Sequence, residues 1–328
     1  MARFARWIAV LAVALFATTV HAADPVPGLI YAVGQKFDKS FNEGAFAGAE
    51  RFKQATGIPV LEFQPQSPAQ FEQAVSALAR RGATDIAVIG FYYATPLAEL
   101  APKFPKLRFT IVDAVVDRPN VQSITFKEQE GAFLVGVLAA MASKTGTLGF
   151  VGALDIPLIR RFIAGYEQGA RHARADARVL VNFVGTTPAA FTDPTTGAEV
   201  ARSQFERGAD VLFAGAGVSN FGVFSAAKDA GRLAIGVDSN QNHLYPGTIL
   251  TSMLKRTDLA VERAFQGGRD GTWRPGVRAL GLKEGGVDYA VDEHNRPLLT
   301  PAMTEAVEAA RRAIVGGVLS VADGTGKP

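Results

Sequence analysis

Short apolar runs alternate with amphipathic segments over the first third of the chain. Residues 28–34 and 86–90 are nearly continuous apolar runs, typical of buried strands, whereas apolar side chains in residues 42–56 and 68–81 recur at helical spacing. The full pattern predicts strands at 28–34, 60–63, 86–90 and 108–113, and helices at 42–56, 68–81 and 95–103. Strands that alternate with helices favour a parallel sheet with helices on both faces.

The alternation starts again after residue 120 and predicts a second α/β unit. A crossing strand at 121–126 leads into a strongly apolar helix at 129–142. Strands are then expected at 147–151, 178–184, 210–214 and 234–237, and helices at 157–174, 197–207 and 221–231. The last part of the chain predicts extended segments at 247–254 and 278–291 and helices at 258–266 and 301–315. No low-complexity linker separates the units, so we expect short connections between two lobes.

The first 22 residues have the order of a secretory signal peptide. Arg3 and Arg6 form a basic start, residues 7–17 are apolar, and residues 20–22 form a small-residue cleavage site. The apolar run is shorter than the ~20 residues that a membrane anchor needs. The sequence contains no cysteine, whereas a bacterial lipoprotein carries its lipid on one. We therefore predict an exported protein that is not a lipoprotein, located in the periplasm if the source is Gram-negative.

The composition narrows the possible classes of function. The chain is 48% apolar and 20% charged, which supports a full core and excludes general disorder. The net charge of +3 comes with no basic cluster outside the signal segment, so we predict no nucleic-acid partner. The absence of cysteine excludes thiolate metal sites and cysteine nucleophiles. His172, His243 and His294 lack metal-ligand spacing, and there is no serine-nucleophile motif. We predict no cofactor, no metal and no catalysis.

Polar and aromatic residues gather directly after several predicted strands. In parallel sheets such positions meet at one edge, where ligands bind. The loops concerned are 34–42, 90–92, 186–193, 215–217 and 238–241, together with Asp113. Residues 215–217 half-match a dinucleotide fingerprint, but the next glycine, Gly222, comes too late in the chain. We prefer the interpretation that Gly215 and Gly217 let the backbone approach a ligand closely.

The segment from Asp38 to Asn42 is the most informative part of the sequence. Asp38 and Ser40 would place acceptors and a hydroxyl beside the start of a helix, where a polar ligand can bind. Alternatively, Asp38 or Ser40 only caps that helix, and Phe41 packs against it. The local sequence leaves both interpretations open.

Residues 38–42, which read Asp-Lys-Ser-Phe-Asn, resemble a signature of the basic membrane protein family, the purine-nucleoside-binding proteins of ABC importers. Further matching stretches follow in order along nearly the whole chain after residue 22. They are 112–113, 120–126, 130–136, 144–146, 149–152, 162–166, 208–211, 235–238 with Gln241, and 251–255. The resemblance implies a type I periplasmic-binding-protein fold, in which two doubly wound α/β lobes are joined by a multi-strand hinge. It places residues 23–125 and about 251–328 in the N-terminal lobe and residues 126–250 in the C-terminal lobe.

The resemblance also implies a ligand site in the cleft between the lobes. Sites of this family hold a purine base between two aromatic rings and bind the ribose with a carboxylate and a lysine. Carried over to this sequence, Phe41 and Phe191 would be the stacking pair, and Asp238 and Lys255 would hold the ribose. Stacking on an aromatic ring contributes about 1–3 kcal/mol per base, and a carboxylate can accept both hydrogens of a vicinal diol.

Asn42 and Asp113 would then contact the base, and the backbone from Gly215 to Gly217 would line the wall. We therefore expect a monomeric, non-enzymatic solute-binding protein that captures a purine nucleoside and delivers it to an ABC permease in the inner membrane. Two alternatives remain open. One is a binding protein for another small solute, such as riboflavin or a free purine base, and the other is an exported nucleoside-processing enzyme.

Overall fold

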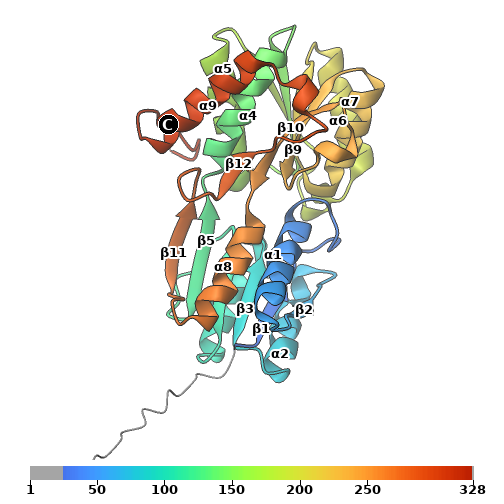
Figure 1. Ribbon diagram of the computed structural model, residues 1–328. Helices are drawn as coiled ribbons and strands as arrows, with labels where there is room; N and C mark the ends of the chain where they lie inside the picture. Colours follow the sequence, from blue (N-terminus) through green and yellow to red (C-terminus); the bar gives the residue numbers. More distant parts are fainter. Residues whose placement is uncertain (1–24, 327–328) are drawn as a thin grey trace, which may run out of the picture.

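The computed structural model describes residues 25–326, and in these residues the chain forms two six-stranded sheets, one in each of two lobes (Figure 1). The first sheet has the order β11-β5-β4-β3-β1-β2, and all its paired strands are parallel. Its strands are β1 (Pro27–Ile30), β2 (Leu61–Phe63), β3 (Asp85–Ile89), β4 (Arg108–Val112), β5 (Val121–Phe126) and β11 (Gly276–Leu280). The predicted signal peptide, residues 1–22, lies outside the described residues.

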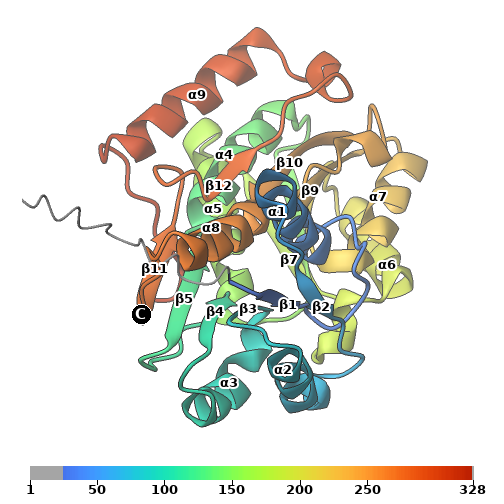
Figure 2. The ribbon, with the colours of Figure 1, turned by 60° about the horizontal axis from the view of Figure 1, so that its bottom comes forward.

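Helices cover both faces of the first sheet (Figure 2). They are α1 (Phe41–Thr56), α2 (Phe71–Arg80), α3 (Ala94–Leu100) and α8 (Thr257–Arg269). Neighbouring strand residues point to opposite faces, which explains why each strand reads as a continuous apolar run. Leu29 of β1 belongs to the core beneath α1 and α8, whereas the next residue, Ile30, belongs to the core beneath α2 and α3.

The second sheet has the order β12-β10-β9-β8-β6-β7, and its strands are parallel except for the antiparallel pair of β10 and β12. The strands are β6 (Thr147–Gly152), β7 (Arg178–Phe183), β8 (Val211–Gly215), β9 (Leu233–Asp238), β10 (Ile249–Lys255) and β12 (Val287–Tyr289). The helices of this lobe are α4 (Glu128–Ala142), α5 (Pro157–Ala173), α6 (Pro194–Glu206), α7 (Asn220–Asp229) and α9 (Pro301–Val315). Helices α4 and α5 pack on one face of the sheet, and α6 and α7 pack on the other.

The chain crosses between the lobes three times within residues 25–326. The crossings are residue 127 between β5 and α4, residue 256 between β10 and α8, and residues 281–286 between β11 and β12. Backbone hydrogen bonds join them: the Lys127 amide donates to the Leu280 carbonyl (3.0 Å) and the Arg256 amide to the Gly286 carbonyl (2.8 Å). The crossings therefore form one connected hinge, and the expected two-lobed α/β fold with a multi-strand hinge is confirmed.

The lobe boundaries differ from those expected from the sequence for the last part of the chain. Only residues 257–280 return to the first lobe, since β10 pairs with β9 and β12 pairs with β10 in the second sheet. Helix α9, which was expected in the first lobe, buries Met303 and Val307 and packs on α4. The predicted extended segment at 278–291 is in fact two strands of different sheets. An apolar pattern predicts that an element is buried, but it does not specify which of two similar cores buries it.

In the part of the chain that the structure describes, no helix has the length and apolar character to cross a membrane.

Candidate ligand-binding site

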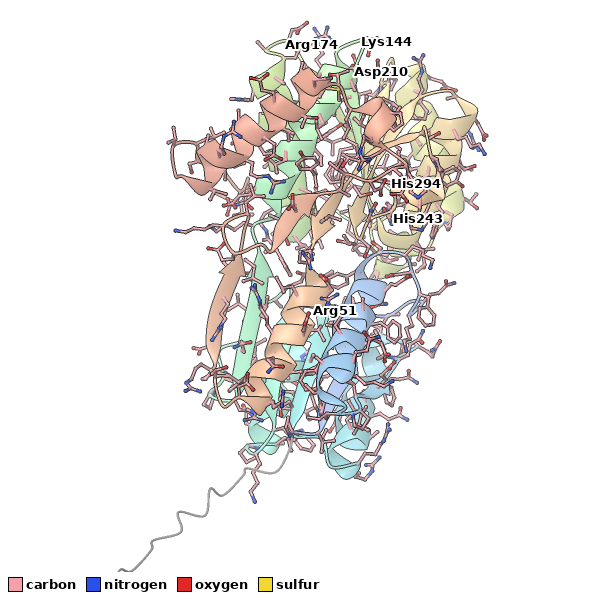
Figure 3. The ribbon with its side chains drawn as sticks, viewed as in Figure 1. Arg51, Lys144, Arg174, Asp210, His243 and His294 are labelled. Carbon is pink, nitrogen blue, oxygen red and sulfur yellow. The ribbon has the colours of Figure 1, made fainter. Side chains whose placement is uncertain are left out.

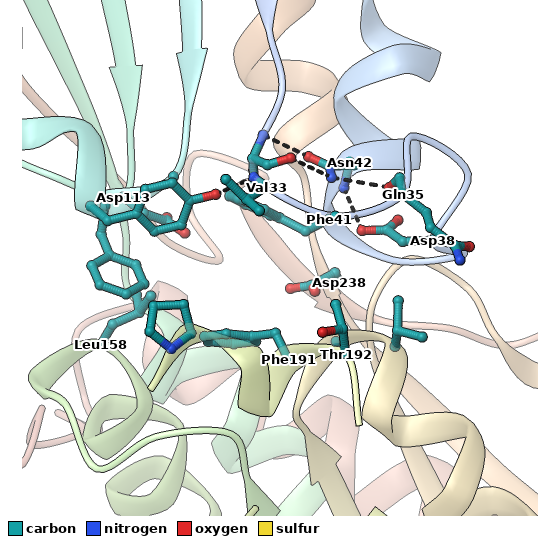
Figure 4. A pocket seen from close by; sticks show the side chains of 18 of the residues that line it. Val33, Gln35, Asp38, Phe41, Asn42, Asp113, Leu158, Phe191, Thr192 and Asp238 are labelled. Atoms are coloured by element: carbon teal, nitrogen blue, oxygen red, sulfur yellow. Dashed lines mark hydrogen bonds between the residues drawn. The ribbon is translucent and has the colours of Figure 1, made fainter. Parts of the chain in front are cut away.

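A cavity of about 550 Å³ lies between the two lobes (Figure 4). Loops after β1, β3 and β4 line it from the first lobe, and loops after β7, β8 and β9 line it from the second. These are the carboxyl ends of parallel strands, where ligands of α/β sheets bind. The volume falls within the ~300–1,000 Å³ that is typical of small-molecule sites. Nine of the ten residues predicted for the site line this one cavity; the exception is Ser40.

Aromatic rings enter the cavity from both lobes. Phe41, the first residue of α1, reaches in from the first lobe, and Phe191, at the end of a short 3₁₀ turn, reaches in from the second (Figure 4). Phe91, Tyr92 and Phe162 also line the cavity. Phe91 and Tyr92 lie in the loop 90–92, which the sequence indicated as a ligand-binding loop, but they were not given a role in the site. Phe162 is 3% exposed on an amphipathic helix, so the sequence pattern cannot distinguish it from a core residue.

Two carboxylates and one ammonium group form a charged cluster in the cavity. Asp113 directly follows β4, Asp238 ends β9 and Lys255 ends β10. The Lys255 Nζ donates to Asp113 Oδ2 at 2.7 Å, so this buried ion pair joins the two lobes. The other oxygen of Asp113, Oδ1, is buried and accepts no hydrogen bond from residues 25–326. Asp113 therefore lies against Lys255, the residue that the resemblance assigns to the ribose, and its expected contact with the base stays a prediction.

The backbone at both carboxylates is strained. Asp113 has φ +72° and Asp238 has φ +67°, values that most non-glycine residues avoid and that aspartate and asparagine tolerate best. Strained backbone persists where the surrounding structure enforces it, and it is concentrated at functional sites. These two turns aim their carboxylates into the cleft.

Burial dominates the electrostatics of this cluster. It raises the pKa of Asp238 to about 6, although Lys255 and the hydroxyl of Ser40 act in the opposite direction. Burial also raises the pKa of Asp113, against the effect of Lys255. For Lys255, burial alone would lower the pKa, but the neighbouring carboxylates outweigh it and the pKa is raised. At pH 7 the lysine is therefore charged and both carboxylates are mostly ionised.

The capping interpretation of the segment from Asp38 to Asn42 describes most of its contacts. Asp38 accepts hydrogen bonds from the backbone amides of Ser40 (2.8 Å), Asn42 (3.0 Å) and Glu43 (3.0 Å) at the start of α1. The hydroxyl of Ser40 donates to Asp238 Oδ2 at 2.5 Å, which ties α1 to the opposite lobe. Ser40 therefore contacts residues that line the cavity, Asp238 and the Val237 carbonyl, without lining it itself.

Asn42 also has a structural role. Its side-chain oxygen accepts from the Ala32 amide (3.0 Å), and its two amide hydrogens go to the carbonyls of Ala32 and Gln35 (3.1 Å each). Both side-chain donors are thus used to hold the loop after β1. Asn42 also lines the cavity, so its expected polar contact with the base stays a prediction, one in which these two donors are already used.

The three glycines of the half-matched dinucleotide fingerprint are explained by packing. A Cβ on Gly215 would lie 2.8 Å from the ring of Phe150, and one on Gly217 would lie 3.1 Å from the carbonyl oxygen of Phe191. A Cβ on Gly222 would lie 1.8 Å from the carbonyl oxygen of Pro194, where α6 and α7 meet. Gly217 has φ +61° and lets Phe191 approach the cavity wall.

Glu128 was missed entirely by the sequence analysis. It is the first residue of α4 and is fully buried, and its Oε1 lies 3.1 Å from Lys255 Nζ. Its Oε2 accepts a hydrogen bond from Arg161 Nε at 2.6 Å. A glutamate in the first turn of a helix is usually exposed and favourable for the helix dipole, so no sequence pattern predicts this burial.

The described residues contain no group of three or more potential metal ligands. His243 and His294 lie near each other on the second lobe, with ring centroids 6.4 Å apart (Figure 3), and neither lines the cavity.

Two α/β lobes with a ligand-sized cavity between them are typical of the type I periplasmic-binding-protein fold. A solute-binding protein of an ABC transporter system from Aeropyrum pernix superposes with a TM-score of 0.81 at 30% identity, over 90% of this chain and 93% of that chain. The chain belongs to the Bmp family of PnrA-like ABC transporter substrate-binding proteins, whose family model matches residues 28–323.

Named relatives agree with this assignment. An ABC transporter nucleoside-binding protein from Lactococcus lactis is 31% identical over 309 residues, which cover 87% of this chain and 85% of the relative. A protein from Pyrococcus horikoshii that is named an uncharacterized lipoprotein is 37% identical over 273 residues, which cover 80% of this chain and 67% of the relative. The resemblance seen in the sequence is thus confirmed. The protein is a substrate-binding protein and not an enzyme, with a small molecule and an ABC permease as its partners.

The comparisons contradict the prediction that this protein is not a lipoprotein. The relative from Pyrococcus horikoshii and its counterparts from two further Pyrococcus species, at 36–37% identity, are all named lipoproteins. The prediction depended on the absence of one residue type, cysteine, from the sequence. It is therefore withdrawn.

Proposed function

We propose that the protein captures a purine nucleoside between its lobes and delivers it to the permease of an ABC importer. The observation that carries this proposal is that two aromatic rings from opposite lobes and a cluster of two carboxylates and a lysine share one cavity. A flat base suits the rings, and a vicinal diol suits the cluster. The name of the Lactococcus lactis relative, a nucleoside-binding protein, supports the same ligand class.

The ribose would bind at the polar cluster. Asp238 and the unpartnered Asp113 Oδ1 are acceptors for hydroxyl hydrogens. Lys255 uses one N–H on Asp113 and has further donors for a ribose oxygen. The backbone of Gly215 and Gly217 would line the wall beside the base.

Calorimetry on ligand-stripped monomeric protein tests the proposal. Inosine, guanosine and adenosine are titrated beside hypoxanthine, riboflavin and ribose. Tight binding of a nucleoside supports the proposal, whereas binding of ribose alone, of riboflavin alone or of none of these compounds contradicts it. Preferred binding of hypoxanthine would favour the free-base alternative. Native mass spectrometry of the same sample checks the expected monomer and any co-purified solute.

Replacing either stacking ring with alanine should weaken nucleoside binding. Phe41→Ala and Phe191→Ala each remove a ring that faces the cavity, and the expected loss is about 1–3 kcal/mol, which is roughly 5- to 150-fold in Kd. The measurement is calorimetry with inosine. Phe37→Ala is the matched control, because Phe37 is 56% exposed and does not line the cavity. Equal affinity of all three variants and the unmodified protein would remove the stacking assignment.

A nucleoside 5′-monophosphate should bind much more weakly than the nucleoside. Asp38, Asp113 and Asp238 line the cavity, and Lys255 is its single lining lysine or arginine within residues 25–326. One like-charge contact at ~6 Å costs about 3 kcal/mol at an effective dielectric constant of ~20. We therefore expect inosine 5′-monophosphate to bind roughly 100-fold or more weakly than inosine in competition calorimetry. Equal affinities would show that the phosphate avoids the cluster and that the ribose is bound elsewhere.

A further inference from the structure

The ammonium group of Lys255 is held by a residue outside the cavity lining. Of the carboxylates near its Nζ, Asp113 lies at 2.7 Å and Glu128 at 3.1 Å. Asp113 lines the cavity, but Glu128 does not. The side chains of Lys255 and Glu128 are 2% and 0% exposed, so this contact is shielded from water on all sides. Three aromatic rings, those of Phe41, Phe126 and Phe162, have their centroids 5.2–5.7 Å from the Nζ and complete the enclosure.

Glu128 is in turn fixed by Arg161 of α5. Arg161 Nε donates to Glu128 Oε2 at 2.6 Å, and the Arg161 side chain is 20% exposed. A buried carboxylate is costly unless its oxygens are paired. Here Oε2 accepts a hydrogen bond from the guanidinium, whereas Oε1 is buried, lies 3.1 Å from the ammonium and accepts no hydrogen bond from residues 25–326. The ion pair alone therefore balances the charge on the Oε1 side, and its attraction holds Lys255 Nζ beside Glu128.

Glu128 and Lys255 both lie next to hinge crossings. Glu128 is the first residue after the crossing at residue 127, and Lys255 is the last residue before the crossing at residue 256. The contact between them thus connects two of the three hinge crossings. Through Asp113, it also reaches the end of β4 in the first lobe.

We propose that Glu128, held by Arg161, is a positioning residue of the ligand site, which fixes the Lys255 ammonium toward a ligand hydroxyl without contacting the ligand. The predicted change in ligand affinity rests on the proposed function, whereas the predicted change in the ordering of the Lys255 ammonium does not. A Glu128 that only stabilised the fold would leave the ordering of the ammonium and the pH dependence of binding unchanged.

The charge of Glu128 also acts on the carboxylates of the cavity. The charged groups that face this cluster are Asp38, Asp113, Glu128, Asp238, Lys255 and Arg161, with Asp323 acting on Arg161. The negative charge of Glu128 raises the pKa of Asp113 and of Asp238. An ionised carboxylate is needed to accept two hydroxyl hydrogens, so affinity should fall as the pH drops through about 6, the pKa of Asp238. Neutralising Glu128 should move this loss of affinity to lower pH.

The test compares Glu128→Gln with the unmodified protein in two measurements. Glutamine keeps the shape of the side chain and can still accept from Arg161. The first measurement is NMR of ¹⁵N-labelled lysine ammonium groups in ligand-free protein, with the Lys255 signal assigned by its loss in Lys255→Met. We expect a slowly exchanging Lys255 signal that is broadened or lost in Glu128→Gln. The second is inosine affinity from pH 5 to 8. We expect about tenfold weaker binding of Glu128→Gln at pH 7.5, and an acid limb, the loss of affinity on acidification, at lower pH than in the unmodified protein.

The control is Glu167→Gln, which removes a partly exposed carboxylate of α5 that pairs with Arg171 and does not line the cavity. It should match the unmodified protein in both measurements. An unchanged Lys255 signal in Glu128→Gln, together with an unchanged acid limb, overturns the inference. If the unmodified protein binds no nucleoside, the proposed function fails, and the ammonium signal alone decides the inference. If Glu128→Gln does not fold, Arg161→Gln decides it, with the exposed Arg160→Gln as control: a Lys255 signal unchanged in Arg161→Gln overturns it.

Discussion

Asp238→Asn should lose most of the nucleoside affinity and keep the fold. The substitution removes the negative charge but retains a residue type that tolerates φ +67°, and the hydroxyl of Ser40 can still donate to the remaining oxygen. A hydrogen bond to a charged group contributes about 1.5–3 kcal/mol, so the loss of two from the ribose diol predicts roughly 100-fold weaker binding or more. Calorimetry with inosine at pH 7.5 measures the effect.

The same variant should show a second, opposite effect on stability. Because burial raises the pKa of Asp238 to about 6, the ionised form destabilises the ligand-free protein. The stability that the protonated group provides is present below the unfolded pKa of ~4 and is lost as the pH rises through about 6. Asp238→Asn should therefore be more stable than the unmodified protein toward urea at pH 7.5, with little difference at pH 4.

Asp229→Asn is the matched control for both measurements, because Asp229 is an exposed aspartate at the end of α7 in the same lobe. It should bind and unfold like the unmodified protein. If Asp238→Asn binds inosine normally, the ribose assignment is wrong. If it is instead less stable at pH 7.5, Asp238 serves the fold rather than the ligand.

Most of the fold could be predicted from the sequence because each strand is buried on both faces. The apolar run at residues 86–90 became β3, and helical spacing at residues 42–56 became α1, with boundaries one residue away in each case. The lobe of the last elements could not be predicted. Residues 278–291 looked like one extended segment, but a hinge crossing divides them into β11 and β12, which pair in different sheets. The pairing of β11 with β5 joins residues more than 100 positions apart, and that of β12 with β10 joins residues more than 30 apart, so no local pattern encodes either.

The candidate site was partly readable from the sequence. Phe41, Phe191, Asp238 and Lys255, which come from four distant segments, line one cavity, and their roles there stay a proposal. Asn42 belongs to the motif at residues 38–42, but the motif does not predict that its side-chain donors hold the loop after β1. The contact of the Lys255 ammonium with Glu128, outside the cavity lining, could not be predicted from the sequence, because the two residues are more than 100 positions apart in the chain.

Lys255→Met should lose nucleoside binding and also destabilise the ligand-free protein in a pH-dependent way. Methionine fits the space of the buried stem but removes the cation that faces Asp113, Glu128 and Asp238. Breaking a buried ion pair by removing one partner costs about 3–5 kcal/mol, because the other charge stays buried without compensation. We expect a loss of this order in the free energy of unfolding by urea at pH 8.

The pH dependence distinguishes this cause from a simple packing defect. Lys255 lowers the pKa of both Asp113 and Asp238, so its removal raises both pKa values further above those of the unfolded chain. Carboxylates with raised pKa values stabilise the fold when they are protonated, and this stability is lost as the pH rises. The gap between Lys255→Met and the unmodified protein should therefore narrow from pH 8 to pH 5, whereas the exposed control Lys103→Met should show no gap at either pH. A gap of constant size would mean that a packing defect, and not the loss of the charge, destabilises Lys255→Met.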